Sequence, residues 1–161
     1  MKKIVVRIAL LVALVSLLLS ACAQPAAPTQ PAQEEKPFRV AVVMPSTITD
    51  LAFSQSFFEA LKKVQEEEGG PSKFEIAYSE GMFNVPDAAA AIRDYASQGY
   101  DLVIAHGSQY GTSLSQIAPD FPETAFAWGT SLDTFQAQGI NNVYAYQAES
   151  QAGGYVLGTI A

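Results

Sequence analysis

The sequence predicts an α/β fold, a parallel sheet with helices on both faces. From Phe38 onward, short runs of β-branched and other apolar residues alternate in strict turn with segments whose apolar residues recur every three or four positions. Strands separated by helices in this way form parallel sheets, because each crossover returns the chain to the same end of the sheet. The alternation therefore predicts one layer of strands between two layers of helices.

Five strands are expected, each from a short apolar run between polar or glycine-rich segments. Their ranges are 38–45, 74–79, 100–106, 124–129 and 142–147. The run at 100–106 (YDLVIAH) is the clearest of them. Ligands in such sheets bind beyond the carboxyl ends of the strands, where the strand order reverses. We therefore expect the functional residues in the loops 45–54, 80–86, 106–112 and 128–133.

Helices are expected between the strands. The first spans 51–68, where Phe53, Phe57, Leu61 and Val64 form one apolar stripe. The second opens at Pro86-Asp87, with Asp87 as the N-cap, and ends at Gly99. Two more are expected at 111–118 and 151–161, and the last stops within an apolar pattern with no cap. We therefore interpret 38–161 as an incomplete lobe of a longer protein.

The first 21 residues have the pattern of a secretory signal. Three basic residues precede an apolar run from Ile8 to Leu19, which is shorter than the roughly 20 residues of a membrane span. A cleaved signal or a one-pass anchor is the alternative reading. Leu19-Ser20-Ala21-Cys22 resembles the lipobox of bacterial lipoproteins, in which the cysteine is acylated and becomes the first mature residue. The sequence thus predicts an extracytoplasmic lipoprotein, anchored to the cell membrane at Cys22.

Residues 22–37 have the composition of a tether. Prolines at 25, 28, 31 and 37 alternate with small residues, and such segments stay extended at about 3.1 Å per residue. Removing the signal takes away Lys2, Lys3 and Arg7, which leaves 6 basic residues against 16 acidic ones, a formal charge of −10. That charge argues against nucleic acid as a partner and against electrostatic binding to anionic lipid. Attachment to the membrane is therefore expected through acyl chains.

The sequence offers little for catalysis. It has no Gly-x-Ser-x-Gly elbow, phosphate loop or Cys/His metal spacing. Cys22 is the only cysteine and His106 the only histidine, which leaves few groups for nucleophilic or acid–base chemistry. We therefore expect no enzyme activity, no cofactor and no metal.

Three stretches resemble the basic membrane protein family, lipoprotein substrate-binding components of ABC importers that include purine nucleoside receptors. They are Val40–Leu61 (VAVVMPSTITDLAFSQSFFEAL), Ala91–His106 (AIRDYASQGYDLVIAH) and Glu149–Ala161 (ESQAGGYVLGTIA). The most specific piece, Ile48–Ser56, is similar to the family's aspartate–x–x–phenylalanine–asparagine signature. The resemblance implies a type I periplasmic-binding-protein fold, in which two lobes clamp a small ligand and deliver it to an ABC permease.

The resemblance also suggests ligand-binding residues. Asp50 and Phe53 match the signature, so the carboxylate would accept hydrogen bonds from sugar hydroxyls and the ring would stack on a base. The alternative is that Asp50 caps the first helix and Phe53 begins its buried stripe. Ser54 stands where the family usually has asparagine. His106, at a strand end, is either a ligand contact or a satisfied structural group, and Trp128 either stacks on ligand or packs in the core.

These features predict a binding lipoprotein whose best single ligand is a nucleoside. A sensory receptor that feeds a kinase or chemoreceptor is a rival, because fold does not determine function. A flavodoxin-like surface hydrolase is a weaker rival, since its nucleophile motif is missing. One lobe supplies only one wall of a cleft, so we expect the 161-residue chain to bind ligand weakly by itself.

Overall fold

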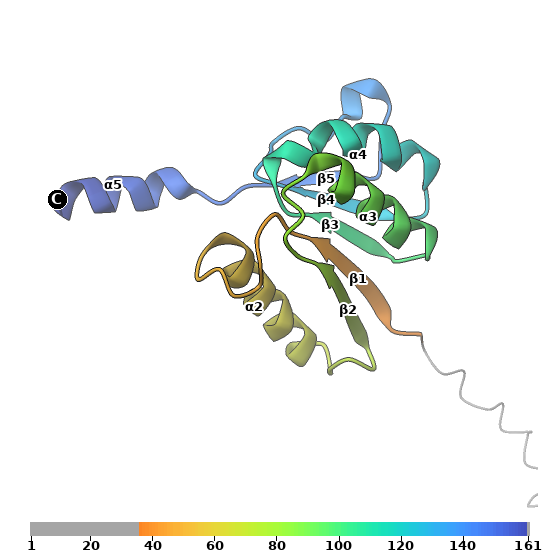
Figure 1. Ribbon diagram of the computed structural model, residues 1–161, viewed down its shortest axis with the longest axis horizontal. Coiled ribbons are helices and arrows are strands. Elements are labelled where there is room, and N and C mark those ends of the chain that lie inside the picture. The colour runs from red at the N-terminus through yellow and green to blue at the C-terminus, as the bar shows by residue number, and fades with distance from the viewer. Residues whose placement is uncertain (1–35, 161) are drawn as a thin grey trace, which may run out of the picture. The chain divides into compact units, whose positions relative to one another are not determined.

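The computed structural model describes residues 36–160, which form a five-stranded, all-parallel sheet with order β2-β1-β3-β4-β5 (Figure 1). The strands are β1 (Phe38–Val43), β2 (Phe74–Ser79), β3 (Leu102–Ala105), β4 (Ala125–Gly129) and β5 (Val143–Tyr146). The predicted fold class is confirmed, and all five expected strands are present, four of them shorter at their ends. The signal, Cys22 and most of the tether lie outside the described residues.

Helices cover both faces of the sheet, as predicted. Helix α2 (Phe53–Glu67) covers one face, and α3 (Val85–Ser97) and α4 (Gly111–Ile117) cover the other, whereas the last helix, α5 (Ser150–Ile160), covers neither. Successive strand residues point to opposite faces, so β1 divides its side chains between two cores. Val40 and Val42 pack with Leu61 of α2, whereas Ala41 and Val43 belong to the core that holds α3 and α4. The α2 face and the α3–α4 face are named accordingly below.

The start of α3 differs from the prediction. The N-cap is Asn84 and the helix begins at Val85, so Asp87 is in the first turn and is not the cap. Proline is well suited to the first turn of a helix, because its φ is already helical and it has no N–H to leave unpaired there. The helix therefore includes Pro86 and begins before it. Gly99 ends the helix with φ +71° as expected, a conformation that glycine adopts without strain.

The loops at the carboxyl edge of the sheet are bonded to one another, because polar groups that leave the sheet here need partners. The bonds are Ile48 N–H to Glu80 Oε2 (2.6 Å), Tyr110 Oη–H to the Met82 carbonyl (2.8 Å) and Trp128 Nε1–H to the Gly107 carbonyl (3.1 Å). They join the loop after β1 to that after β2, the β2 loop to the β3 loop, and β4 to the β3 loop. Hydrogen bonds therefore connect the loops after β1, β2 and β3 and the end of β4 along this edge.

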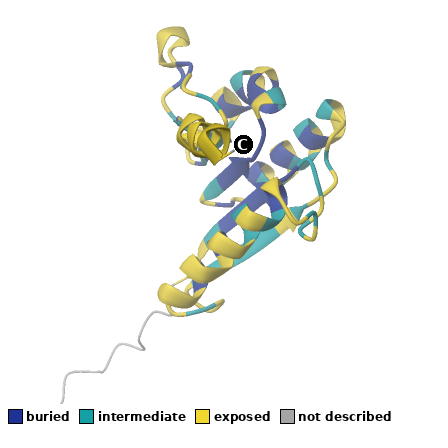
Figure 2. Cartoon of the chain, turned by 90° about the vertical axis from the view of Figure 1, so that its left-hand side faces the viewer, coloured by how far each residue is buried: buried dark blue, intermediate teal, exposed yellow. Residues whose placement is uncertain are grey.

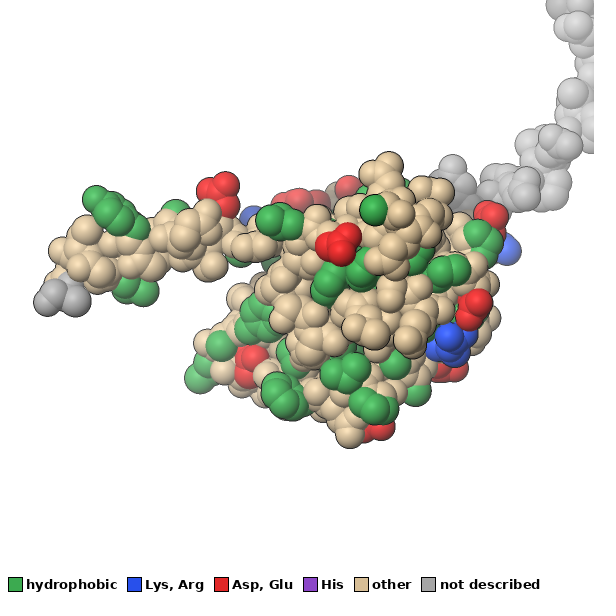
Figure 3. Space-filling view, turned by 90° about the horizontal axis from the view of Figure 1, so that it is seen from above, with side chains coloured by type: hydrophobic (Ala, Val, Ile, Leu, Met, Phe, Trp, Pro, Cys, Tyr) green, Lys and Arg blue, Asp and Glu red, His purple; other side chains and the backbone are tan. Residues whose placement is uncertain are grey.

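Helix α5 is exposed along its whole length (Figure 2). Its large apolar residues remain 54–76% exposed, and hydrophobic side chains are visible on its surface in Figure 3. They are Tyr155, Val156, Leu157 and Ile160. Of the helices in residues 36–160, none has the length and hydropathy needed to cross a bilayer. Exposed apolar surface of this extent is typical of an interaction surface.

Gly111 is expected to tolerate no side chain. It is buried at the start of α4, and a Cβ built on it would overlap the indole ring of Trp128. We expect Gly111→Ala to lower the free energy of unfolding by about 1–3 kcal/mol, the usual cost of overpacking. Urea denaturation followed by circular dichroism measures this, with the exposed Thr112→Ala in the same helix as control. Equal stability of the two variants would show that Trp128 moves aside freely.

Candidate functional site

A hollow of about 420 Å³ lies beside α2 at the carboxyl edge. One wall is a stripe of α2, and the other walls come from the ends of β3, β4 and β5. Its lining residues are Phe53, Ser56, Phe57, Ala60, His106, Thr130, Tyr146, Gln147 and Ala148. The strand order reverses between β1 and β3, so the hollow is at the edge where open α/β sheets bind ligands.

Asp50 clamps the beginning of α2. Its carboxylate accepts backbone N–H bonds from Ala52 (2.9 Å), Ser54 (3.1 Å) and Gln55 (3.1 Å). Partial desolvation acts to raise the pKa of Asp50, but these bonds outweigh it and hold the pKa below its ordinary value. A carboxylate has about four acceptor sites, so three are already occupied. The geometry therefore matches the capping alternative and leaves little capacity for ligand hydroxyls.

The backbone before α2 is strained to allow this clamp. Leu51, between Asp50 and the helix, has φ +56° and is 89% exposed. Non-glycine residues with positive φ are uncommon and often occur at functional sites. Here the left-handed residue turns the chain so that the Asp50 carboxylate can reach the first turn of α2.

Phe53 lies at the mouth of the hollow with 40% of its surface exposed. Its ring stacks on the imidazole of His106, with centroids 3.9 Å apart and planes 13° apart. Phe57 stacks on the same imidazole at 4.2 Å. Two rings this close to one imidazole must lie on its opposite faces, so His106 is held between two phenyl rings one helical turn apart. Phe53 is thus supported from within the lobe while part of it faces the hollow.

Both nitrogens of His106 are bonded inside the lobe. Nε2 lies 3.2 Å from the Phe53 carbonyl oxygen, and Nδ1 lies 2.7 Å from Tyr146 Oη. A carbonyl only accepts, so Nε2 carries the proton and Nδ1 accepts from the tyrosine hydroxyl. Burial lowers the pKa of His106, against the opposing effects of the Phe53 carbonyl and the Asp50 charge. The side chain is therefore a neutral, buried, fully bonded group.

Ser54 has no exposed surface. Its hydroxyl accepts a hydrogen bond from the backbone N–H of Ser46 at 3.2 Å, which joins α2 to the loop that follows β1. In this structure the side chain at the position of the family's asparagine thus stabilises the loop.

Trp128 lies on the α3–α4 face, away from the hollow. Its indole stacks on Phe135 with centroids 5.1 Å apart, and it packs against the core that contains α3 and α4. The structure therefore brings Phe53 and His106 together at the hollow, with Asp50 and Ser54 behind the first turn of α2, and Trp128 apart from them.

Sequence reasoning did not single out Phe57 as a site residue. Phe57 belongs to the predicted apolar stripe, and its spacing of four from Phe53 places both rings on one side of the helix. The family resemblance does suggest Tyr144, Tyr146 and Glu149 as contacts to ligand or hinge, because they lie near the family's crossing segment, but it does not suggest that Tyr146 bonds His106. Tyr146 is 40 residues from His106, and no local pattern could pair them.

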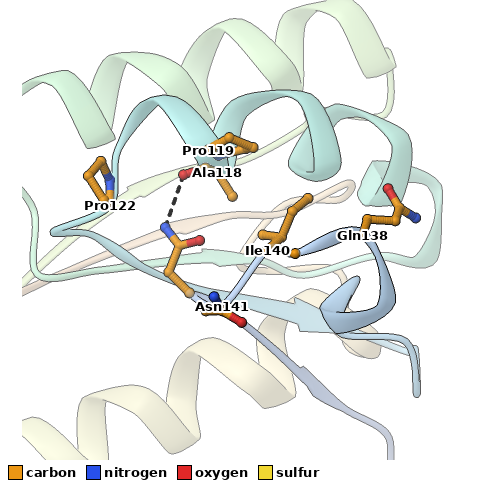
Figure 4. Close-up of a pocket in the computed structure, with 8 residues that line it drawn as sticks. Ala118, Pro119, Pro122, Gln138, Ile140 and Asn141 are labelled. Carbon is orange, nitrogen blue, oxygen red and sulfur yellow. Dashed lines mark hydrogen bonds between the residues drawn. The ribbon is translucent and has the colours of Figure 1, made fainter.

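A second hollow, of about 380 Å³, lies at the amino edge of the sheet, beside the segments that lead into β4 and β5 (Figure 4). It is lined mainly by proline, alanine, isoleucine and amide residues. The Nδ2 atom of Asn142 lies 2.9–3.0 Å from the carbonyl oxygens of Ala118, Phe121 and Thr124, which share its two hydrogens. This side chain therefore ties the loop before β4 to β5. We place the candidate site at the carboxyl edge, where aromatic side chains and His106 converge.

Comparison with known families identifies the group to which the chain belongs. The model of the family described as ABC transporter substrate-binding protein PnrA-like matches residues 38–161. The chain belongs to this family. Among curated proteins it is similar to the transcriptional activator protein med of Bacillus subtilis (strain 168), with 29% identity over 90 residues, 55% of this chain and 26% of that protein. The chain thus spans about a quarter of that relative.

Solved structures support the fold of this PnrA-like chain. A solute-binding protein of an ABC transporter system from Conexibacter woesei DSM 14684 matches with TM-score 0.55 and 23% identity, over 68% of this chain and 34% of that one. A putative lipoprotein fragment from Peptoclostridium difficile 630 matches with TM-score 0.58 and 21% identity, over 78% of this chain and 96% of that one. A solute-binding protein of an ABC transporter system from Aeropyrum pernix K1 matches with TM-score 0.52 and 20% identity, over 69% of this chain and 28% of that one. The lobe thus has the fold of periplasmic-binding-type proteins and spans about a third of the two solute-binding chains.

Proposed function

We propose that the chain is the first lobe of an extracytoplasmic binding lipoprotein that captures a nucleoside or similar small polar molecule for an ABC permease. The family match supports a solute-binding role. The observation that carries the ligand class is the half-exposed ring of Phe53 at the carboxyl edge, supported from behind by His106. A planar base can stack on such a ring, and a base–aromatic stack is worth about 1–3 kcal/mol.

The proposal includes a second lobe that closes over this wall. The solved solute-binding chains are about three times as long as the matched part of this one. The exposed apolar residues of α5 support a further packing partner. Binding by the 161-residue chain alone is accordingly expected to be much weaker than binding by the complete gene product.

Membrane attachment through Cys22 belongs to the same proposal. The lipobox-like Leu19-Ser20-Ala21-Cys22 motif supports it. Replacement of the cysteine tests it: Cys22→Ser should release the protein from the membrane fraction and abolish incorporation of labelled palmitate. Continued incorporation of the label would place the lipid elsewhere.

A sensing role is the alternative, and one observation favours it. The curated relative has the name of a transcriptional activator, so regulation is within the range of its relatives. An ABC permease and ATPase encoded beside the gene would favour transport, and a kinase or chemoreceptor in that place would favour sensing.

Phe53→Ala tests whether the Phe53 ring stacks on the ligand. We expect the affinity of the complete gene product for adenosine, inosine or guanosine to fall about 10- to 100-fold, because the stack is lost. Isothermal titration calorimetry measures it. Phe58→Ala is the matched control, since Phe58 lies on the same helix but packs on Tyr78 at 4.8 Å. Unchanged affinity in Phe53→Ala, or equal losses in both variants, would remove Phe53 from the site.

A further inference from the structure

His106 was expected to touch ligand or to be a satisfied structural group, and its surroundings suggest a more specific role. It is 4% exposed, and neither ring nitrogen is free, since one bonds Phe53 and the other Tyr146. A ligand would have to displace one of these partners to reach it. The partners themselves are informative, because they belong to different parts of the lobe.

The bond to Phe53 acts on the backbone of the proposed ligand wall. Phe53 is the first residue of α2, and its carbonyl accepts the Nε2–H of His106 at 3.2 Å. The phenyl rings of Phe53 and Phe57 then enclose the imidazole. His106 therefore links the first turn of α2 directly to the end of β3.

The bond to Tyr146 reaches the point where the chain leaves the sheet. Tyr146 is the last residue of β5, and residues 147–149 connect it to α5. Its ring also stacks on Phe57, with centroids 5.8 Å apart. The departing segment and the first turns of α2 are thus connected through the imidazole and the Phe57 ring.

Gly129 makes this connection possible. Strand β4 separates β3 from β5, and Gly129 pairs with Tyr146, while Ala105 pairs with Trp128 and so brings His106 beside Gly129. A Cβ at position 129 would lie 2.6 Å from Tyr146 Oη and 3.3 Å from His106 Nδ1. Because β4 has no side chain here, the residues of its two neighbours meet across it.

We propose that His106 and Tyr146 are positioning residues. Their hydrogen bond crosses β4 at Gly129 and fixes the first turn of α2, which carries the Phe53 ring, to residues 147–149 after β5. This linkage is called the lock below. Neither residue is required to touch the ligand. A change in the orientation of residues 147–149 would then shift the Phe53 ring and so change the affinity for the ligand. The role in binding rests on the function proposed above, whereas the lock itself is a property of the ligand-free lobe.

Tyr146→Phe removes the hydroxyl and keeps the ring. Without its donor, the Nδ1 of His106 loses its partner, and the side-chain ¹⁵N shifts should show an increased share of the Nδ1–H tautomer. Hydrogen exchange in the ligand-free protein should become faster both in the first turn of α2 and at residues 147–149. The control is Tyr78→Phe, a tyrosine on the same sheet face that packs on Phe58 of α2. It should change neither readout.

Exchange that quickens only after β5, with α2 unchanged, would overturn the lock. In the complete gene product, Tyr146→Phe should weaken binding of the nucleoside that Phe53→Ala weakens, by about fivefold, the equivalent of one hydrogen bond. Gly129→Ala should weaken it similarly by forcing Tyr146 away. Affinity within twofold of wild type in both variants would overturn the positioning role. Absence of any nucleoside binding by the wild type would refute the proposed ligand, while the exchange experiment would still decide the lock.

Discussion

Replacing Trp128 with alanine is expected to lower the free energy of unfolding by about 3 kcal/mol, at the low end of the cost of truncating a packed tryptophan, because the residue is only half-buried. The change would remove the stack on Phe135 and the packing over Gly111. It would also leave the Gly107 carbonyl without the indole N–H that it now accepts. Urea denaturation followed by far-ultraviolet circular dichroism measures the loss without relying on tryptophan fluorescence.

Trp128→Phe separates the two possible roles of this residue. It keeps an aromatic ring on Phe135 and removes the N–H bond, so the stability loss should shrink to about 1 kcal/mol. If Trp128 is structural, nucleoside affinity of the complete gene product should stay within twofold. A tenfold loss of affinity in this mildly destabilised variant would instead assign Trp128 a ligand contact and would extend the site to the α3–α4 face.

The sheet could be predicted because local patterns determine it. The β-branched runs of β1 and β3 are short, apolar and separated by helical stripes, and the parallel order follows from that alternation. The boundaries were less accurate where two signals compete. At the start of α3, Asp87 is a good cap by residue type, but the preference of Pro86 for the first turn places the cap at Asn84.

The candidate site was only partly predictable, because its contacts are long-range. Sequence reasoning located the carboxyl edge and singled out Phe53, and the structure places its ring at the hollow. It could not decide between ligand contact and helix capping for Asp50, which depends on the positive φ of Leu51. The pairing of His106 with Tyr146 depends on strand order and on the missing side chain at Gly129. Neither is encoded in a local pattern.

His106→Ala is the other change with a large expected effect. It would remove two hydrogen bonds, worth about 1 kcal/mol each, and two ring stacks of about 0.5–1.5 kcal/mol each. We therefore expect the free energy of unfolding at pH 7.5 to fall by about 3–5 kcal/mol. His106→Gln should lose less, since its amide can still donate to the Phe53 carbonyl. Equal losses in the two variants would mean that the bond to Phe53 contributes nothing.

The effect of His106→Ala should depend on pH in a defined direction. Burial lowers the pKa of His106 in the folded protein from its ordinary 6.5, so the unfolded chain takes up the proton first as the pH falls. The stabilisation by His106 is then complete above about pH 6.5 and is lost as the pH falls through the folded pKa. The ionisable groups near His106, namely Tyr146 and Asp50, do not change their charge in the pH range where His106 takes up its proton. Tyr146 remains protonated because burial raises its pKa, and backbone bonds lower the pKa of Asp50 below 3.8.

Wild type and His106→Ala should therefore differ most in stability near pH 7–8, and the difference should shrink as the pH falls below about 6.5. Denaturation curves at half-unit intervals of pH measure the difference, and subtraction of the variant removes the contributions of carboxylates common to both. A constant difference on either side of about pH 6.5 would mean that the imidazole titrates alike in the folded and unfolded chain. That result would contradict a buried neutral ring, because a ring held between two phenyl groups and bonded at both nitrogens cannot accept a proton as easily as a solvated one.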